Sequence, residues 1–211
     1  MLNIHLLMMF CIFNLSIMVL INSALWYVHP NIKNRKYFTY FGICFLFGQY
    51  LITFVNILPD YLTLVLGNNL MILGEIFLLM AIKSFLGKIV NWDKRYYLFL
   101  LTTILLFYVF AYLFDSIFIR LGIFSIISTV FLSSIAWLFF QEKSVKNRFI
   151  NNISAFIFFL GAVLFLIRTF AIPSINLPLN FLDTTNLLIL LSYLYLSFLS
   201  IWIIVLTTIK K

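Results

Sequence analysis

The sequence predicts an all-α membrane protein, in which residues 1–211 form one domain, a polytopic bundle of seven transmembrane helices. The first reason is composition, because 64% of the 211 residues are hydrophobic and 9% are charged, whereas soluble domains have roughly 45–50% apolar and about 25% charged residues. The mean hydropathy is +1.14. The second reason is that the apolar residues form long runs, and the third is that charge alternates between these runs. We therefore expect the lipid bilayer to surround the chain.

Each predicted helix corresponds to one apolar run of about 20 residues, the length that crosses the hydrocarbon core of a bilayer. The seven runs are Ile4–Val28, Tyr37–Leu58, Leu62–Ile82, Tyr97–Phe114, Ile117–Phe140, Phe149–Ile172 and Thr184–Ile209. The first run is longer than the apolar part of a secretory signal, which has about 7 to 15 residues, and no positive charge precedes it. We therefore expect it to be retained as a helix.

The basic residues predict the orientation, because Lys and Arg are retained in the short cytoplasmic loops of membrane proteins. Twelve of the 14 lie in one set of alternate connections: Lys33, Arg35, Lys36, Lys83, Lys88, Lys94, Arg95, Lys143, Lys146, Arg148, Lys210 and Lys211. The opposite set contains Asp60, Asp115 and Asp183 and no Lys. This predicts a protein of the cell membrane with its N-terminus outside and its C-terminus in the cytoplasm. Because the basic residues are scattered between apolar runs, the net charge of +8 does not indicate a nucleic-acid partner.

The connections give a first view of the packing. Those at Pro59–Asp60 and Asp115–Ser116 are short, so helices two and three, and helices four and five, should form antiparallel hairpins. The longest outer connection, 173–183, is a linker or a lid. Aromatic residues that anchor helix ends in the interface are expected at the edges, and these are Trp26, Tyr27, Trp92, Tyr96 and Tyr97.

Polar and small residues recur every seven positions along several predicted helices, which places them on one face of each helix. These stripes are Gly42, Gln49 and Asn56; Asn68 and Glu75 beside Gly67 and Gly74; Ser154, Gly161 and Arg168; and Asn186, Tyr193 and Ser200. One interpretation is close packing through small residues and interhelical hydrogen bonds. The other is a polar pocket in the outer half of the bundle.

Charged residues inside the spans are the candidates for function, since an unpaired charge there costs about 2.5 kcal/mol or more. At 1.5 Å per residue, Arg168 lies about 7 Å below the outer end of its helix and Glu75 about 20 Å below the outer end of its own, so a direct salt bridge between them is not expected. We expect an anionic or carbonyl-bearing ligand at the six candidate binding residues Arg168, Asn68, Gln49, Asn56, Glu75 and Arg120.

Two alternatives remain open for these charges. Arg168 could cap carbonyl groups of the outer loops or extend to the membrane surface. Glu75 could be neutral in place with no function, with Ser133, Ser134 or a water as its partner.

Nothing in the sequence predicts an enzyme, a metal site or a cofactor. His5 and His29 lie at opposite ends of the first helix, and no HExxH motif, nucleophile elbow or phosphate-binding glycine loop is present. Cys11 and Cys44 lie within apolar runs and have no CxxC spacing, so we expect them to be small core residues.

Two stretches resemble the seven-helix sensor regions found at the N-termini of bacterial GGDEF-type diguanylate cyclases. The first is VLGNNLMILGEIFLLMAIKSFLG at 65–87, and the second is LFLIRTF, which contains Arg168 and is followed by an outer loop and a final helix ending in basic residues. The resemblance implies a sensing role in a bacterial inner membrane. It implies no cyclase activity, because the sequence stops at Lys211, where those proteins continue into a signalling linker and a cyclase domain.

The leading hypothesis is therefore a receptor-like sensor that binds a ligand from the outer side and signals to a cytoplasmic protein. The alternatives are a small-solute transporter or channel and an accessory membrane subunit. A polar cavity that reaches both faces would favour transport, whereas a pocket closed below Arg168 would favour sensing. The sequence does not predict the oligomeric state.

Overall fold

The computed structural model describes residues 4–54, 57–114, 117–142, 148–171 and 180–209. Within these ranges the chain forms seven α-helices and one π-helical segment, and no strand. Their bounds are α1 Ile4–Val28, α2 Lys33–Thr53, η1 (π-helical) Tyr61–Leu66, α3 Gly67–Phe85, α4 Lys94–Tyr112, α5 Ile117–Gln141, α6 Arg148–Ala171 and α7 Asn180–Ile209. The prediction of an all-α bundle of seven helices is confirmed.

The largest error in the predicted boundaries concerns α2, which begins at Lys33 rather than at Tyr37 and ends at Thr53 rather than at Leu58. Its first turn is basic, but one of its cations is buried. Arg35 is 4% exposed, and its Nη1 donates a hydrogen bond of 3.1 Å to the carbonyl oxygen of Leu25 in the last turn of α1. Because this bond satisfies a carbonyl that has no partner within its own helix, the basic turn belongs to the bundle.

The third predicted helix has two parts. Its first turns are η1, a wider π-helical segment, and α3 continues from Gly67. The end of α3 is fixed by Gly87, whose φ of 72° lies in the left-handed region. The amide of Lys88 donates to the carbonyl of Lys83 at 2.8 Å, which is the hydrogen bond of a glycine-terminated helix.

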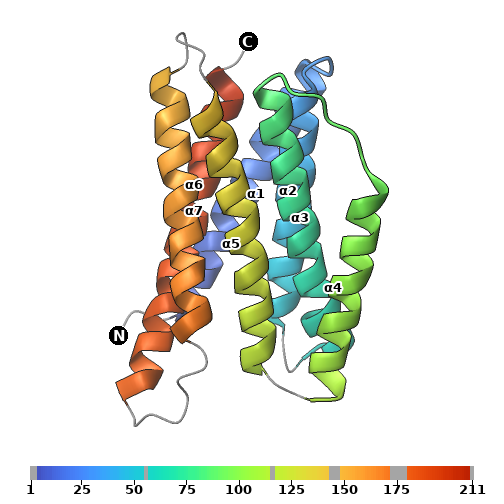
Figure 1. Cartoon of the computed structure of the whole chain (residues 1–211), viewed down its shortest axis with the longest axis vertical. Helices are drawn as coiled ribbons and strands as arrows, with labels where there is room; N and C mark the ends of the chain where they lie inside the picture. Colours follow the sequence, from blue (N-terminus) through green and yellow to red (C-terminus); the bar gives the residue numbers. More distant parts are fainter. Residues whose placement is uncertain (1–3, 55–56, 115–116, 143–147, 172–179, 210–211) are drawn as a thin grey trace.

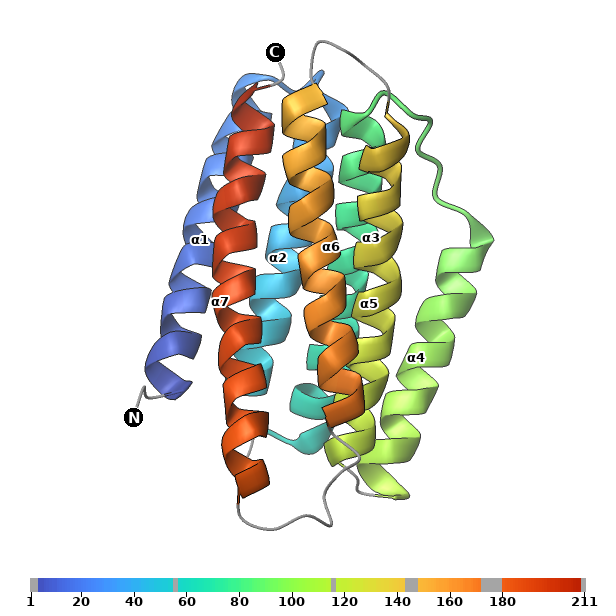
Figure 2. The same cartoon turned by 60° about the vertical axis from the view of Figure 1, so that its left-hand side comes forward.

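Six helices form a closed ring, in the order α1, α2, α3, α5, α6, α7 and back to α1. Helix α4 lies outside this ring, against η1, α3 and α5 (Figure 2). Its buried residues are Thr103, Phe107 and Ala111. The closest pairs are α2 with α3 and α5 with α6, so the predicted hairpin of α2 and α3 is tight, whereas α4 packs only lightly on α5.

The surface of the bundle is apolar and its interior contains polar groups, which is the reverse of a soluble protein. Large apolar side chains point outward on every α-helix except α3, and examples are Phe13, Phe47, Leu101, Val130, Phe159 and Ile201. Six helices are long and apolar enough to cross a membrane, namely α1, α3 with η1, α4, α5, α6 and α7. The chain is therefore a multi-pass membrane protein. Only α2 falls short of this criterion among the described helices.

Glycines allow close contact between helices, as the packing interpretation of the stripes predicted. A Cβ at Gly48 would lie 2.7 Å from the carbonyl oxygen of Gly67, and one at Gly74 would lie 3.3 Å from that of Phe41. On α6, a Cβ at Gly161 would overlap the ring of Tyr195. Small residues at these positions are what permits the helix spacing.

The two termini lie at opposite ends of the bundle (Figure 1). The end that contains the C-terminus also contains the start of α2, the end of α3 and the start of α6, where Lys33, Lys83 and Arg148 are found. We call it the basic end. The other end, which contains the last turn of α6 and the start of α7, is called the far end.

Candidate ligand pocket

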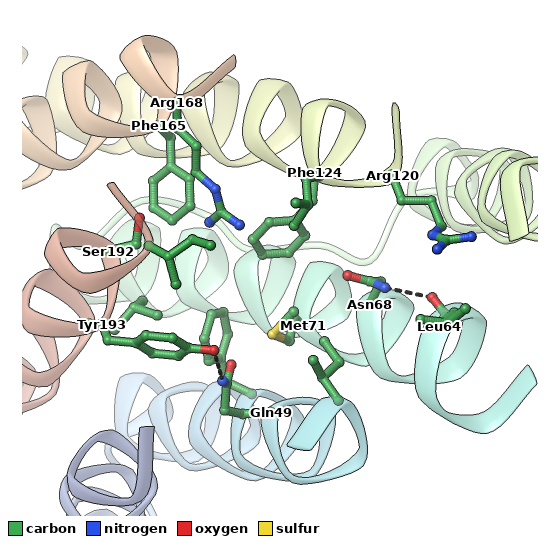
Figure 3. A pocket seen from close by; sticks show the side chains of 15 residues that line it. Gln49, Leu64, Asn68, Met71, Arg120, Phe124, Phe165, Arg168, Ser192 and Tyr193 are labelled. Atoms are coloured by element: carbon green, nitrogen blue, oxygen red, sulfur yellow. Dashed lines mark hydrogen bonds between the residues drawn. The ribbon is translucent and has the colours of Figure 1, made fainter. Parts of the chain in front are cut away.

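A cavity of about 180 Å³ lies inside the ring, in the half of the bundle near the far end. Five helices and η1 surround it, and Figure 3 shows its side chains pointing inward from several of them. The lining residues are Phe45, Gln49, Ile52, Leu64, Asn68, Met71, Arg120, Leu121, Phe124, Phe165, Arg168, Ile189, Ser192, Tyr193 and Leu196. Four of the six candidate binding residues, Gln49, Asn68, Arg120 and Arg168, thus share one cavity.

Arg168 supplies the central cation of this pocket. It lies in the last turn of α6, and its side chain extends over the ring of Phe165, with the guanidinium carbon 5.9 Å from the ring centroid. Such a contact attracts a cation only weakly. No residue in the described ranges accepts a hydrogen bond from this guanidinium, which has five N–H donors. Its end points into the cavity (Figure 3).

Gln49 and Tyr193 form the polar wall opposite Arg168. The amide Nε2 of Gln49 donates a hydrogen bond of 3.0 Å to the hydroxyl oxygen of Tyr193, and Gln49 is 4% exposed. This bond holds the Tyr193 side chain in place, and because the hydroxyl oxygen is the acceptor, the hydroxyl proton of Tyr193 points away from Gln49. The pocket therefore has a cation on one side and a neutral donor on the other.

Asn68 and Arg120 line the pocket, but their donors are used within the protein. Asn68 donates to the carbonyl oxygen of Leu64 at 2.6 Å, one helical turn away. Arg120 is 7% exposed, and its Nη1 donates to the carbonyl oxygen of Phe110 near the end of α4 at 2.9 Å. Arg120 thus bonds the end of α4 as Arg35 bonds the end of α1. The structure therefore supports the prediction of a ligand donor less for Arg120 than for Arg168.

Glu75 does not line this pocket. It is 5% exposed and lies deeper, beside a space of about 10 Å³ that it shares with Tyr195. The hydroxyl of Ser128 on α5 donates to Oε1 of Glu75 at 2.5 Å. The expectation that Ser133 or Ser134 is its partner is wrong, because both residues face outward. The sixth candidate, Asn56, lies outside the described residues.

The pocket has an apolar floor toward the basic end. Phe45, Phe165 and Leu196 border both the pocket and the small space beside Glu75. Further along, the rings of Phe139 and Phe158 stack with centroids 5.9 Å apart, and Phe85 packs on Phe139 at 6.3 Å. The described residues thus close the cavity below Arg168 with packed aromatic side chains.

Two polar lining residues were not predicted as site residues. Tyr193 follows the stripe of Asn186 and Ser200, so its inward direction was visible in the sequence, but its bond to Gln49 was not. Ser192 is buried in the wall next to it. Serine is common at helix contacts in membranes, and this serine has no feature in the sequence that distinguishes it from the others.

Comparisons of the chain with protein-family models, curated proteins and solved structures give no match.

Proposed function

We propose that the chain is a seven-span membrane receptor or sensor module, with its N-terminus outside and its C-terminus in the cytoplasm. In this proposal it binds a small anionic or carbonyl-bearing molecule at the Arg168 pocket and transmits occupancy to a cytoplasmic partner. The observation that carries the proposal is the guanidinium of Arg168, which points into a cavity and has no hydrogen-bond acceptor among the described residues.

The chemistry of this group indicates the class of ligand. A guanidinium is permanently charged and presents a planar fork of donors that fits a carboxylate or phosphate with two parallel hydrogen bonds. Within a membrane, leaving such a group without a partner is costly. An anion or a carbonyl oxygen bound between Arg168 and the Gln49–Tyr193 pair would remove this cost.

The size and lining of the cavity restrict the ligand further. A volume of about 180 Å³ equals that of about six water molecules in the liquid, at ~30 Å³ each, and is below the ~300–1,000 Å³ typical of pockets for drug-sized ligands. The rings of Phe45, Phe124 and Phe165 supply apolar contacts. A short carboxylic acid with an apolar tail matches both properties.

The closed floor supports binding rather than passage. A transporter or channel needs a polar route between the two ends, at least in alternation. In this conformation the pocket is followed by a space of about 10 Å³ and then by the packed rings of Phe85, Phe139 and Phe158. Glu75 lies beyond the floor and is bonded to Ser128, so it is not placed to receive a solute from the pocket.

The position of the pocket suggests how occupancy could be transmitted. It touches α2, α3, α5, α6 and α7, and those helices reach the basic end, where the predicted cytoplasmic connections lie. A ligand that contacts Arg168 on α6 and Gln49 on α2 favours the distance between these two helices at which it contacts both residues best. The basic connections would then present a changed surface to a partner protein.

The proposal is tested with purified protein in detergent and a series of short carboxylates, from acetate to hexanoate and benzoate, each paired with its primary alcohol and amide. We expect one or more carboxylates to raise the melting temperature, amides to do so more weakly and alcohols not at all. Arg168→Lys keeps the charge but loses the fork, and should weaken the carboxylate affinity about tenfold, or ~1.4 kcal/mol.

The matched control is Arg35→Lys, which alters a buried arginine that bonds Leu25 at the basic end. It should lower the melting temperature without ligand and leave the carboxylate-induced shift intact. If no carboxylate, amide or alcohol shifts the wild type, or if Arg168→Lys and Arg168→Gln lower stability equally and leave the shifts unchanged, Arg168 is structural and the pocket hypothesis is wrong. Carboxylate uptake into liposomes that depends on Glu75 would establish the transporter instead.

A further inference from the structure

A second, larger cavity lies far from the Arg168 pocket, at the basic end, between the last turns of α3 and the start of α4. It is a groove of about 600 Å³, lined by Met80, Lys83, Ile89, Val90, Asn91, Trp92, Asp93, Arg95 and Tyr96. The segment 86–93 runs down the outside of the bundle, so α4 begins well below the end of α3 (Figure 2). The groove thus lies outside the ring of six helices, beside the start of α4.

The depth of the groove matches the polar headgroup region of a bilayer. Its α3 residues, Met80 and Lys83, precede the end of that helix at Phe85 by five residues or fewer, so they lie within about 8 Å of the helix end. Aromatic side chains lie on the membrane side of this level, because Phe77 is eight residues, or about 12 Å, from the end of α3. The ring of Trp92 packs against Phe77, Tyr96 and Tyr97 with centroids 5.4–5.6 Å apart, as amphipathic rings do at a membrane interface.

The charges of the groove are basic and largely available. Lys83 is half-buried, and no acceptor for its ammonium exists among the described residues. Arg95 pairs with Asp93 at 3.5 Å, but the two side chains are 91% and 52% exposed, and exposed pairs of this kind are weak. The stretch 83–95 holds four basic residues, Lys83, Lys88, Lys94 and Arg95, against one acid, Asp93.

An unused donor accompanies these cations. The indole Nε1 of Trp92 is shielded from solvent and has no hydrogen-bond partner. Indole nitrogen can only donate, so the group that completes this site must be an acceptor. A phosphate diester supplies several acceptor oxygens and a negative charge, which pair with the two cations and, after a small rotation of the Trp92 ring, with the indole N–H.

We propose that this groove binds the headgroup of an anionic phospholipid, whose acyl chains lie along the exposed apolar face of α4. That face presents Leu98, Leu101 and Leu105, which are 62–65% exposed, immediately below the groove. A zwitterionic lipid would bring its own cation toward Lys83 and Arg95, and the four basic residues of 83–95 outnumber the one acid, Asp93, so an anionic lipid is favoured. Basic pockets between helices bind such lipids in other membrane proteins.

The test measures the melting temperature of the purified full chain in a neutral detergent with added phosphatidylglycerol, phosphatidylcholine or inorganic phosphate. We expect phosphatidylglycerol to raise it and the other two to have little effect. The double variant Lys83→Gln with Arg95→Gln should lose at least tenfold in the apparent affinity for phosphatidylglycerol. Its matched control is Lys33→Gln with Lys36→Gln, which removes the same charge from the same end of the bundle and should retain the shift.

Trp92→Phe keeps the ring and removes the N–H, and is used if the double variant does not fold. We expect it to weaken phosphatidylglycerol binding while leaving the melting temperature without lipid nearly unchanged. Equal loss of the shift in the two double variants would show general attraction to a basic surface and would overturn the site. Full retention of the shift in Lys83→Gln with Arg95→Gln, or in Trp92→Phe, would also overturn it. An equal shift with inorganic phosphate would establish a free-anion site in place of a lipid site. None of these results depends on the Arg168 pocket.

Discussion

Gln49 and Tyr193 join α2 to α7 through a hydrogen bond of 3.0 Å from Nε2 to the tyrosine hydroxyl. In the ring α1 lies between these two helices and packs on both of them, and α2 and α7 also touch each other directly at a few positions. The bond joins α2 and α7 on the inner side of α1, at the cavity that Gln49 and Tyr193 both line. It forms the pocket wall that faces Arg168.

Tyr193→Phe removes this bond and keeps the ring. Interhelical hydrogen bonds in membranes contribute about 0.6 kcal/mol on average and up to about 1.7 kcal/mol, so we expect a loss of stability in that range and weaker ligand binding. Thermal unfolding in detergent measures the first effect. Tyr50→Phe is the control, because Tyr50 is 49% exposed on the same helix as Gln49. Additive effects of Tyr193→Phe and Gln49→Leu in a double-mutant cycle would contradict the bond.

Ser128→Ala should destabilise the protein through Glu75. The serine hydroxyl donates to Glu75 Oε1, and Oε2 of the same carboxyl is buried without a partner. Removing the one bonded donor leaves both oxygens unsatisfied, at a cost of about 1–3 kcal/mol. Ser134→Ala on the same helix is the control, because that hydroxyl bonds only the Val130 carbonyl at the exposed surface.

The two serine variants are compared by their melting temperatures in the same detergent. A similar small change for both would show that the Ser128 bond does not stabilise the bundle. Combining Ser128→Ala with Glu75→Leu offers a further check. If the Glu75 bond is the origin of the effect, Ser128→Ala should cost little once the carboxyl has been removed.

Much of the fold follows from the apolar runs, since a run of about 20 residues has one stable form in lipid. The start of α2 was missed because basic residues were assigned to loops, whereas Arg35 enters the bundle to bond Leu25. The position of α4 outside the ring was not predictable. Its sequence is apolar on all sides, so no periodicity distinguishes a face that meets other helices from one that meets lipid.

The stripes explain how much of the pocket was predicted. Gln49, Asn68 and Arg168 belong to faces that turn away from lipid, and one interpretation of the stripes was a polar pocket in the outer half of the bundle. The partner of Glu75 was missed for a different reason. Ser128 and Ser133 are close in depth on α5, but five residues along a helix turn the side chain to another face. Because the serine and threonine residues of α5 lie on several of its faces, the sequence did not indicate which face is internal.

Gly161→Ala should destabilise the contact between α6 and α7. A Cβ at this position would overlap the phenol ring of Tyr195, including its hydroxyl, and Tyr195 is 8% exposed within the core. Overpacking of this kind costs about 1–3 kcal/mol. Gly122→Ala on α5 is the control, because a Cβ there has no neighbour within 4 Å. Thermal unfolding of both variants gives the comparison.

The cause of the Gly161 effect is separable from a general preference for glycine. Tyr195→Ala removes the ring that a Cβ would meet. In that background Gly161→Ala should be nearly neutral, or slightly stabilising because alanine favours helix more than glycine does. An undiminished loss in the Tyr195→Ala background would show that the ring is not the obstacle.

The topology prediction that most needs a test concerns α2. Among the described helices, α2 is the one that is not apolar enough to be identified as a membrane span from its composition. Its 21 residues give a length of about 32 Å, which matches the hydrocarbon core of about 30 Å. It also lies in the ring between α1 and α3, so its inner face meets protein and can carry polar residues such as Gln49. We therefore expect it to cross.

Reporter fusions on the two sides of α2 decide this point. Fusions after Lys36, Lys88 and Lys146 should report the cytoplasm, and fusions near Asp60, Asp115 and Pro178 should report the outside, because twelve of the 14 basic residues lie in the first set of connections. If the Lys36 and Asp60 fusions report the same side, α2 does not cross and the chain has six spans. An external report from the Lys88 fusion would contradict the whole orientation, and with it the assignment of the Arg168 pocket to the outer half of the membrane.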